Sequence, residues 1–76
     1  MFSKNIFCER VKLLRETNNL TQKQLAKNIN ISDKTISMIE TKQRAATIEV
    51  IYALADYFIV SIDYLVGRTD NPDINK

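Results

Sequence analysis

The sequence predicts an all-α domain of five short helices around one hydrophobic core. Glycine and proline occur only once each, both near the end of the chain, so little in the sequence interrupts a helix. Apolar residues make up 45% of the chain and recur at helical spacing rather than in alternation. Residues that favour helix N-caps precede several of these runs. A chain of 76 residues corresponds to one small domain.

The first helix is expected over about residues 5–18. Phe7, Val11 and Leu14 fall at positions i, i+4 and i+7, which places them on one face. The asparagine pair at 18–19 is suited to the end of a helix, where the backbone turns into a left-handed conformation.

Two short helices are expected next. Thr21 and Gln24 have the spacing of a capping box, which predicts a second helix over about residues 22–28. A tight turn at 28–31 follows, and Ser32 is a good N-cap for a third helix over about residues 33–41. The residues expected to face inward from the second helix are Leu25, Ala26 and Ile29.

The remaining helices follow a loop at residues 42–46. Thr47 is the expected N-cap of the fourth helix and Ser61 that of the fifth, with Gly67 just past its end. The apolar residues of the fourth helix recur at helical spacing: Ile48, Ile51, Leu54, Ala55 and Phe58. Residues 1–67 are therefore assigned to the domain, and residues 68–76 (RTDNPDINK) to a polar tail.

Composition excludes several classes of function. The chain has no histidine and a single cysteine, Cys8, which leaves no zinc site, no Cys/His nucleophile pair and no internal disulfide. We therefore expect no metal, no cofactor and no enzymatic activity, with Cys8 acting as a small apolar residue. No run of 18 apolar residues is present, and the N-terminus lacks the pattern of a signal peptide. A soluble cytoplasmic protein without a membrane segment is expected.

Charge is distributed unevenly along the chain. Residues 1–44 carry nine Lys or Arg and four Asp or Glu, a net charge of +5, whereas residues 45–76 carry two and five, a net charge of −3. A basic half joined to an acidic half indicates one face suited to a polyanion. Random scatter of surface charge is the alternative reading.

The second and third helices have the features of a helix-turn-helix. Ala26 supplies a small side chain where the two helices cross, and Asn30 is the residue of the turn that best tolerates positive φ. Three isoleucines are then expected to hold the third helix on the core: Ile31, Ile36 and Ile39.

The opposite face of the third helix carries short polar side chains, one cation and one thioether. At about 100° per residue, Lys34, Ser37, Met38 and Thr41 cluster away from the core side, with Asp33 at their N-terminal flank. Side chains of these types can donate to, accept from or pack on base edges in a DNA groove.

The stretch LTQKQLAKNINISDKTISMIE resembles the phage-repressor-like (XRE-type, Cro/repressor) helix-turn-helix domain. The resemblance extends from about Phe7 to Leu65, and SIDYLVGRTDNP is similar to small Gram-positive bacterial and prophage regulators. It implies a five-helix, lambda-repressor-like fold that binds double-stranded DNA at palindromic operators, usually as a homodimer, and regulates transcription. A protein-interaction module of antitoxin or anti-repressor type on the same fold is the alternative.

Position by position, the resemblance implies that the third helix is the recognition helix. Gln22 matches a phosphate-contacting position, Ser32 one that touches backbone or base, and Thr35 one that flanks the bases. The residues that match base-reading positions are Asp33, Lys34, Ser37 and Met38. Arg15 and Glu40 match a pair that forms a salt bridge between the first and third helices.

Each of these residues also has a simpler interpretation. Lys34 could be a solvated lysine, Met38 a core residue, and Asp33 a favourable charge at a helix N-terminus. Gln22 could be an ordinary first-turn residue. The further cations of the region are expected to anchor phosphates, or else only to add solubility: Lys23, Lys27, Lys42 and Arg44.

The sequence departs from the family pattern at several turns. Asn30, Lys42 and Ile59 stand where glycine is usual, and Ala46 replaces a proline. A β-branched residue at positive φ is strained, so the turn at Ile59 either takes another conformation or costs stability. At Lys42 the loop geometry, including backbone contacts to phosphate, is in doubt.

Apolar residues near the end of the domain exceed what one small core needs. Phe58 and Leu65 are expected in the core, and the candidates for a homodimer interface are Tyr57, Ile62 and Tyr64. A chain this short leaves no room for a small-molecule effector site.

Overall fold

The computed structural model describes residues 4–43 and 46–74. Within these ranges the regular structure is entirely helical, which confirms the predicted fold class. The first helix lies one residue earlier than expected at both ends, and the third ends one residue earlier. The helices are α1 (Lys4–Thr17), α2 (Gln22–Asn28), α3 (Asp33–Glu40), α4 (Ile48–Phe58) and α5 (Ile62–Leu65).

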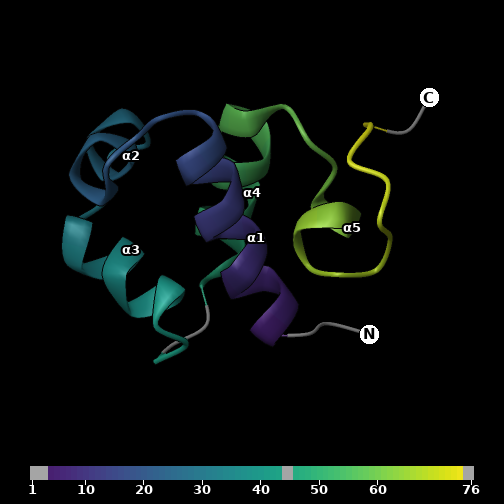
Figure 1. Cartoon of the computed structure of the whole chain (residues 1–76), viewed down its shortest axis with the longest axis horizontal. Helices are drawn as coiled ribbons and strands as arrows, with labels where there is room; N and C mark the ends of the chain where they lie inside the picture. Colours follow the sequence, from purple (N-terminus) through teal and green to yellow (C-terminus); the bar gives the residue numbers. More distant parts are fainter. Residues whose placement is uncertain (1–3, 44–45, 75–76) are drawn as a thin grey trace.

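The helices are arranged around α1. Figure 1 shows α2 and α3 together on one side of α1, with α5 on the other side. The packing agrees with this view, because α3 contacts both α1 and α2 while α5 contacts both α1 and α4. The helix-turn-helix therefore occupies one end of the molecule, and the end of α4 with α5 occupies the other.

Helices α2 to α5 all begin with a hydroxyl cap. The side chains of Thr21, Ser32, Thr47 and Ser61 each accept a hydrogen bond from the backbone N–H three residues further on. At α2 the side chain of Gln24 accepts in return from the Thr21 N–H at 2.8 Å, which completes the capping box. All four predicted caps are confirmed.

The five helices also end in one common way. After each helix one residue takes a positive φ, its N–H bonds to the carbonyl three residues back, and the next N–H bonds to the carbonyl five residues back. This is the Schellman arrangement, which satisfies two carbonyls of the last turn and redirects the chain sharply. The residues with positive φ are Asn19, Asn30, Lys42, Ile59 and Gly67.

Ile59 resolves the alternative that the sequence left open. It adopts φ 57° and ψ 50°, the left-handed helical conformation, and its side chain is 73% exposed. A β-branched residue is strained in this conformation, by about 1–2 kcal/mol for a residue with a Cβ. The turn therefore takes the left-handed conformation, and the strain at Ile59 lowers the stability of the domain.

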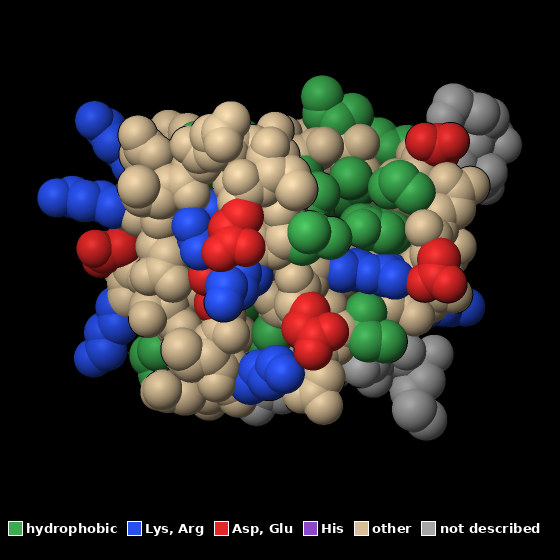
Figure 2. All heavy atoms as spheres, in the orientation of Figure 1, with side chains coloured by type: hydrophobic (Ala, Val, Ile, Leu, Met, Phe, Trp, Pro, Cys, Tyr) green, Lys and Arg blue, Asp and Glu red, His purple; other side chains and the backbone are tan. Residues whose placement is uncertain are grey.

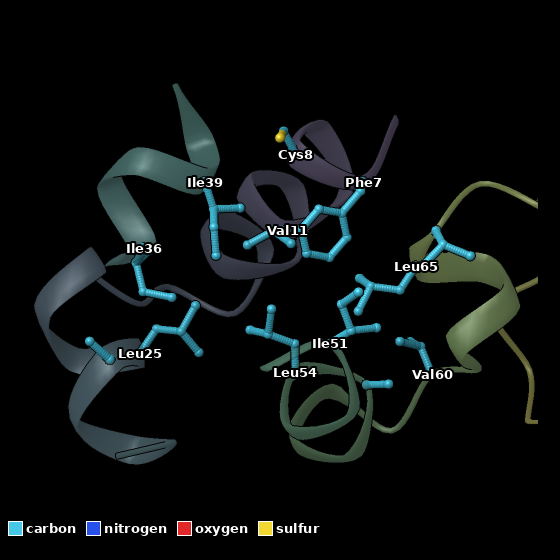
Figure 3. Packing of buried hydrophobic residues seen from close by; sticks show 13 residues of the cluster. Phe7, Cys8, Val11, Leu25, Ile36, Ile39, Ile51, Leu54, Val60 and Leu65 are labelled. Carbon is cyan, nitrogen blue, oxygen red and sulfur yellow. The ribbon is translucent and has the colours of Figure 1, made fainter. Parts of the chain in front are cut away.

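The core collects side chains from all five helices. In Figure 3 the labelled residues of α1, α3, α4 and α5 point toward a common centre, except Cys8, which lies on the far side of α1, and Leu25 of α2 lies at one side. Cys8 is fully buried, in keeping with its expected role as a small apolar residue. The fully buried large side chains include Phe7, Val11, Leu25, Ile36, Ile39, Leu54 and Leu65.

Ile48 does not lie in the core, contrary to its helical spacing. It is the first residue of α4 and is 69% exposed, whereas Ile51, one turn further along, is 7% exposed. The expectation failed because spacing identifies a face of a helix but not how far along that face the core extends.

The residues expected to form the polar tail lie partly against the domain. The backbone N–H of Ser61 donates to the Pro72 carbonyl at 2.9 Å. From α1, Arg10 Nη1 donates to the Thr69 carbonyl at 2.6 Å. The segment after Gly67 therefore packs beside α5 and α1.

Candidate nucleic-acid interface

The inner side of the helix-turn-helix is fixed by packing. Ala26 is 2% exposed, which allows α2 and α3 to approach closely, and Ile36 and Ile39 of α3 are fully buried. Asn30 has φ 64°, as expected for the residue that makes the turn between them. The orientation of α3 is therefore set by its buried face, and its other face is left to the surface.

The outer face of α3 carries the side chains that the sequence placed there. Asp33 and Lys34 are exposed, and Ser37 and Met38 are partly exposed. Met38 is thus a surface residue of the recognition face rather than part of the buried core. One cation, one carboxylate, one hydroxyl and one thioether share this short helix.

Ser32 and Thr35 are bonded to each other. Ser32 Oγ accepts from the Thr35 N–H at 3.1 Å, and the two hydroxyl oxygens lie 2.8 Å apart and share a hydrogen bond. This pair fixes the first turn of α3. Since a hydroxyl is both donor and acceptor, each retains capacity for a further bond to phosphate or base.

Arg15 and Glu40 join α1 to the last turn of α3. Arg15 Nε donates to Glu40 Oε2 at 2.6 Å and Nη2 donates to Glu40 Oε1 at 3.0 Å. The side chains are 13% and 3% exposed. The hydrogen bond to Glu40 raises the pKa of Arg15 above its ordinary value, against the opposing effect of burial.

Gln22 belongs to the same group of side chains. Its Nε2 donates to Glu40 Oε1 at 3.0 Å, which links the start of α2 to the end of α3. The sequence analysis predicted a phosphate contact for Gln22 and did not indicate this bond. Gln22 and Glu40 are 18 positions apart, and no local pattern predicts a contact over that separation. The amide nitrogen has a second hydrogen that can still donate to phosphate.

Lys42 lies beside an acidic side chain of α1, and the structure does not test its predicted phosphate contact. Its Nζ is 3.3 Å from Glu9 Oε2, and both side chains are largely exposed. Its backbone N–H and that of Gln43 close the end of α3, so neither is free to bind a phosphate. Lys23 and Lys27 of α2 are exposed. Arg44 lies outside the described residues.

The three candidate interface residues differ in their surroundings. Tyr57 is 37% exposed, and its hydroxyl accepts from Asn28 Nδ2 at 2.9 Å. Ile62 is half-buried against the core. The ring of Tyr64 lies under the guanidinium of Arg10, 4.1 Å from its centroid. Two more exposed apolar side chains, which the sequence analysis did not name as interface candidates, lie on α4 and directly after it: Tyr52 and Ile59.

Comparison with known proteins identifies the class. A helix-turn-helix family model matches residues 11–65, which is more than half of the chain. The chain belongs to this helix-turn-helix family, of XRE type, whose members are DNA-binding transcriptional regulators.

Two relatives are named as regulators of this class. The chain is 34% identical over 68 residues to the uncharacterized HTH-type transcriptional regulator YobD of Bacillus subtilis (strain 168), covering 90% of this chain and 61% of YobD. It is 30% identical over 69 residues to the HTH-type transcriptional regulator PrpR of Mycobacterium tuberculosis (strain ATCC 25618 / H37Rv), covering 91% of this chain and 14% of PrpR. The chain thus spans less than two thirds of either relative.

The described residues also bear on membrane insertion and metal binding. In the part of the chain that the structure describes, no helix is both long and apolar enough to cross a membrane. Across the same residues no three side chains of His, Cys, Asp or Glu come together as a metal site would require.

Proposed function

We propose that this chain regulates transcription by binding DNA sequence-specifically, with α3 lying in the major groove. The observation that carries the proposal is the division of α3 into two faces. Ile36 and Ile39 are fully buried and hold the helix, while its outer face presents Lys34 and Met38 toward solvent. A helix held rigidly on one side with short polar groups on the other suits the reading of base edges.

The distribution of charge supports the same orientation. Lysine side chains project from the end of the molecule that holds α2 and α3, whereas hydrophobic side chains gather toward the end that holds α5 (Figure 2). The exposed lysines of α2 and α3 are Lys23, Lys27 and Lys34. Such a basic end attracts the phosphate backbone and supplies the part of the affinity that depends on salt.

Roles follow from the chemistry of each side chain. Lys34 donates to guanine O6 and N7, Met38 packs on a thymine methyl, and Asp33 accepts from cytosine N4. Ser37 contributes a hydroxyl that suits either partner. Gln22, Ser32 and Thr35 position the first turns of α2 and α3. Gln22 approaches a phosphate with its second amide hydrogen, and so does whichever of the two hydroxyls does not donate to the other.

The proposal includes a homodimer on a palindromic operator, acting as a prophage-like repressor in the cytoplasm. Partly exposed apolar side chains at the end that holds α5, among them Ile62 and Tyr64, support self-association there. A two-fold pair of recognition helices about 34 Å apart reads half-sites separated by about 10 bp. A protein-interaction module of antitoxin or anti-repressor type is the second candidate, supported by the same apolar side chains.

Selection of bound sequences from a random duplex pool, at fixed near-physiological salt, tests the proposal. We expect one palindrome with half-sites a helical turn apart. Lys34→Glu should abolish the enrichment, while the matched charge reversal Arg68→Glu, on the exposed segment after α5, should leave it unchanged. A folded protein that enriches no sequence would refute DNA reading and favour the second candidate.

A further inference from the structure

Residues 68–74, here called the C-terminal strap, are held by one side chain of α1. Arg10 Nη1 donates to the carbonyl of Tyr64 and, at 2.6 Å, to the carbonyl of Thr69. Arg10 Nη2 also donates to the Asp70 carboxylate at 2.7 Å. A single guanidinium thus connects α1, the end of α5 and the strap.

The hydrogen bonds from Arg10 to the two carbonyls, and its contact with the Tyr64 ring, account for most of the attachment of the strap to α1. The Asp70 side chain is fully exposed, and an ion pair that faces water contributes little. In contrast, the Arg10 side chain is 15% exposed and its guanidinium lies over the Tyr64 ring. Partial burial strengthens both the cation–π contact and the hydrogen bonds to the two carbonyls.

The far end of the strap lies against the surface of α4 and α5. The Ser61 N–H donates to the Pro72 carbonyl at 2.9 Å. Two residues later Ile74 lines an open cavity of about 180 Å³, with a lining that is otherwise mostly apolar. The other lining residues are Tyr52, Ala55, Asp56, Val60 and Ile62.

The strap therefore lies on the surface proposed for self-association. Ile62 and the 47% exposed Ile74 line the same open cavity, and Tyr64 is beneath the guanidinium that anchors Thr69. We propose that the strap, held by Arg10, covers part of the dimer surface, and that its release strengthens self-association. The inference rests on the proposed homodimer and names a second copy of this chain as the occupant of the uncovered surface.

The second copy is favoured because the apolar lining of the cavity already includes an exposed ring. Tyr52, which lines the cavity, is 64% exposed, and Ile59, which precedes Val60 in the chain, is 73% exposed. Moving Ile74 out of the cavity would leave Ile62 and Val60 more exposed beside Tyr52. Burial of such a surface between two copies removes it from water and favours association.

Four variants test the individual contacts that attach the strap to the domain. Truncation after Gly67 removes the strap, and Arg10→Met removes the donors while keeping an apolar chain over Tyr64. Ile74→Ser weakens only the contact at the cavity. Asp70→Asn is the matched control, because it changes the fully exposed partner and leaves both carbonyl bonds in place.

Two measurements are made on each variant. Amide hydrogen exchange at Ser61 reports whether the strap is docked, because the partner of this N–H is the Pro72 carbonyl. Exchange at the fully buried Leu54 reports whether the core is intact. Sedimentation equilibrium then gives the dimer dissociation constant of each variant without DNA.

With Arg10→Met and with the truncation, Ser61 should exchange faster while Leu54 stays protected, and the dissociation constant should fall about tenfold. Ile74→Ser should lower it by a smaller factor, and Asp70→Asn should leave it within about twofold. If the truncated chain does not fold, Arg10→Met and Ile74→Ser carry the test. A dissociation constant that stays the same or rises once Ser61 is exposed would overturn the inference.

This result is separable from the proposed function. If the full chain still selects a palindrome and binds it as two copies while strap release leaves association unchanged, only the covering role fails. If no sequence is enriched from the duplex pool, DNA reading fails whatever the strap does.

Discussion

Arg15 and Glu40 are 25 residues apart, and Arg15 donates two hydrogen bonds to the Glu40 carboxylate, at 2.6 and 3.0 Å. A third donor of Arg15, Nη1, bonds to the Leu20 carbonyl at 2.7 Å. One guanidinium thus joins α1, the turn that precedes α2 and the end of α3. Because α3 has only eight residues, fixing its last turn fixes the orientation of its whole outer face.

Removal of one partner of this pair should destabilise the fold strongly. Glu40→Gln leaves the largely buried Arg15 charge with only the more distant and exposed Glu16 carboxylate at 3.8 Å, and should lower the free energy of unfolding by about 3 kcal/mol. The core of a domain this small supplies only about 3–5 kcal/mol in all. Urea unfolding followed by circular dichroism measures the change.

The double variant Arg15→Met with Glu40→Leu is the companion experiment. Apolar side chains of similar volume leave no buried charge, so its stability should lie within about 1 kcal/mol of the original. Glu9→Gln, which breaks the exposed pair with Lys42, should change stability by less than about 0.5 kcal/mol. A double variant as unstable as Glu40→Gln would contradict the assignment of the cost to an unpaired charge.

The contribution of the Arg15–Glu40 pair to the free energy of unfolding should not decrease as the pH is raised above about 7. The pKa of Arg15 is raised above its ordinary value by the bond to Glu40. A raised pKa of a cation means that its contribution is fully present below the ordinary value and is lost only as pH passes the raised one. The difference in unfolding free energy between the original chain and the double variant should therefore stay constant from about pH 7 to pH 10. A decline within that range would show that Arg15 does not carry the effect.

Ile59→Gly should stabilise the domain. Glycine removes the strain of a β-branched residue at φ 57°, and the side chain lost is 73% exposed, so little packing is given up. The strain of about 1–2 kcal/mol, less the backbone entropy of glycine, leaves a gain of about 0.5–1 kcal/mol. Thermal unfolding should show a midpoint about 4 °C higher.

Gly67→Ala is the reciprocal change and should destabilise. Gly67 has φ 90°, and an added Cβ would lie 3.0 Å from Ile6 Cγ2. Asn30→Gly should have a smaller effect than Ile59→Gly, since asparagine tolerates the left-handed conformation. If Asn30→Gly and Ile59→Gly stabilised the domain equally, strain at Ile59 would not be the cause of the gain in stability.

Ser32→Ala should weaken α3 at its start. The variant loses the hydrogen bond that the Thr35 N–H donates to Ser32 Oγ and the bond between the two hydroxyls, at a cost of about 1 kcal/mol in unfolding free energy. Thr47→Ala, which removes the equivalent cap of α4, should cost a similar amount. In a DNA-binding titration only Ser32→Ala should lower affinity beyond what its loss of stability predicts.

Lys27→Gln should change the salt dependence of DNA binding without changing the preferred sequence. Loss of one phosphate contact should reduce the slope of log affinity against log salt by about 0.9. Lys34→Gln, in contrast, should relax the preference at one base position, because its contact is proposed to be with guanine. Fluorescence anisotropy over a range of salt, on matched and mismatched duplexes, separates the two. An unchanged slope for Lys27→Gln would remove it from the interface.

Local features of the chain can be predicted from its sequence. Thr21, Ser32, Thr47 and Ser61 mark the starts of four helices, and each cap acts within three residues of itself. The turn residue Asn30 and the buried faces of α2 and α3 also follow from short-range pattern. The resemblance to a known family then supplies the order of helices and the position of the recognition face.

Contacts between distant residues are harder to anticipate. The bond from Gln22 to Glu40, the pairing of Lys42 with Glu9, and the exposure of Ile48 have no counterpart in local spacing. The strap is the largest of these differences, since RTDNPDINK reads as polar and unstructured by composition. Arg10 and Ser61 engage it by its backbone carbonyls, which every residue carries and no composition reveals.

The sequence by itself therefore determined the helices and their caps, because these depend on hydrogen bonds and periodicities within a few residues, and its resemblance to a known family indicated the class of protein. Only the tertiary structure decided which charged and polar groups meet across the fold. It decided that Ile59 would adopt a strained conformation, and that Ile74 of the strap would line the same cavity as Ile62. Those outcomes depend on how whole helices pack, and packing brings together residues such as Arg10 and Thr69 that are 59 positions apart.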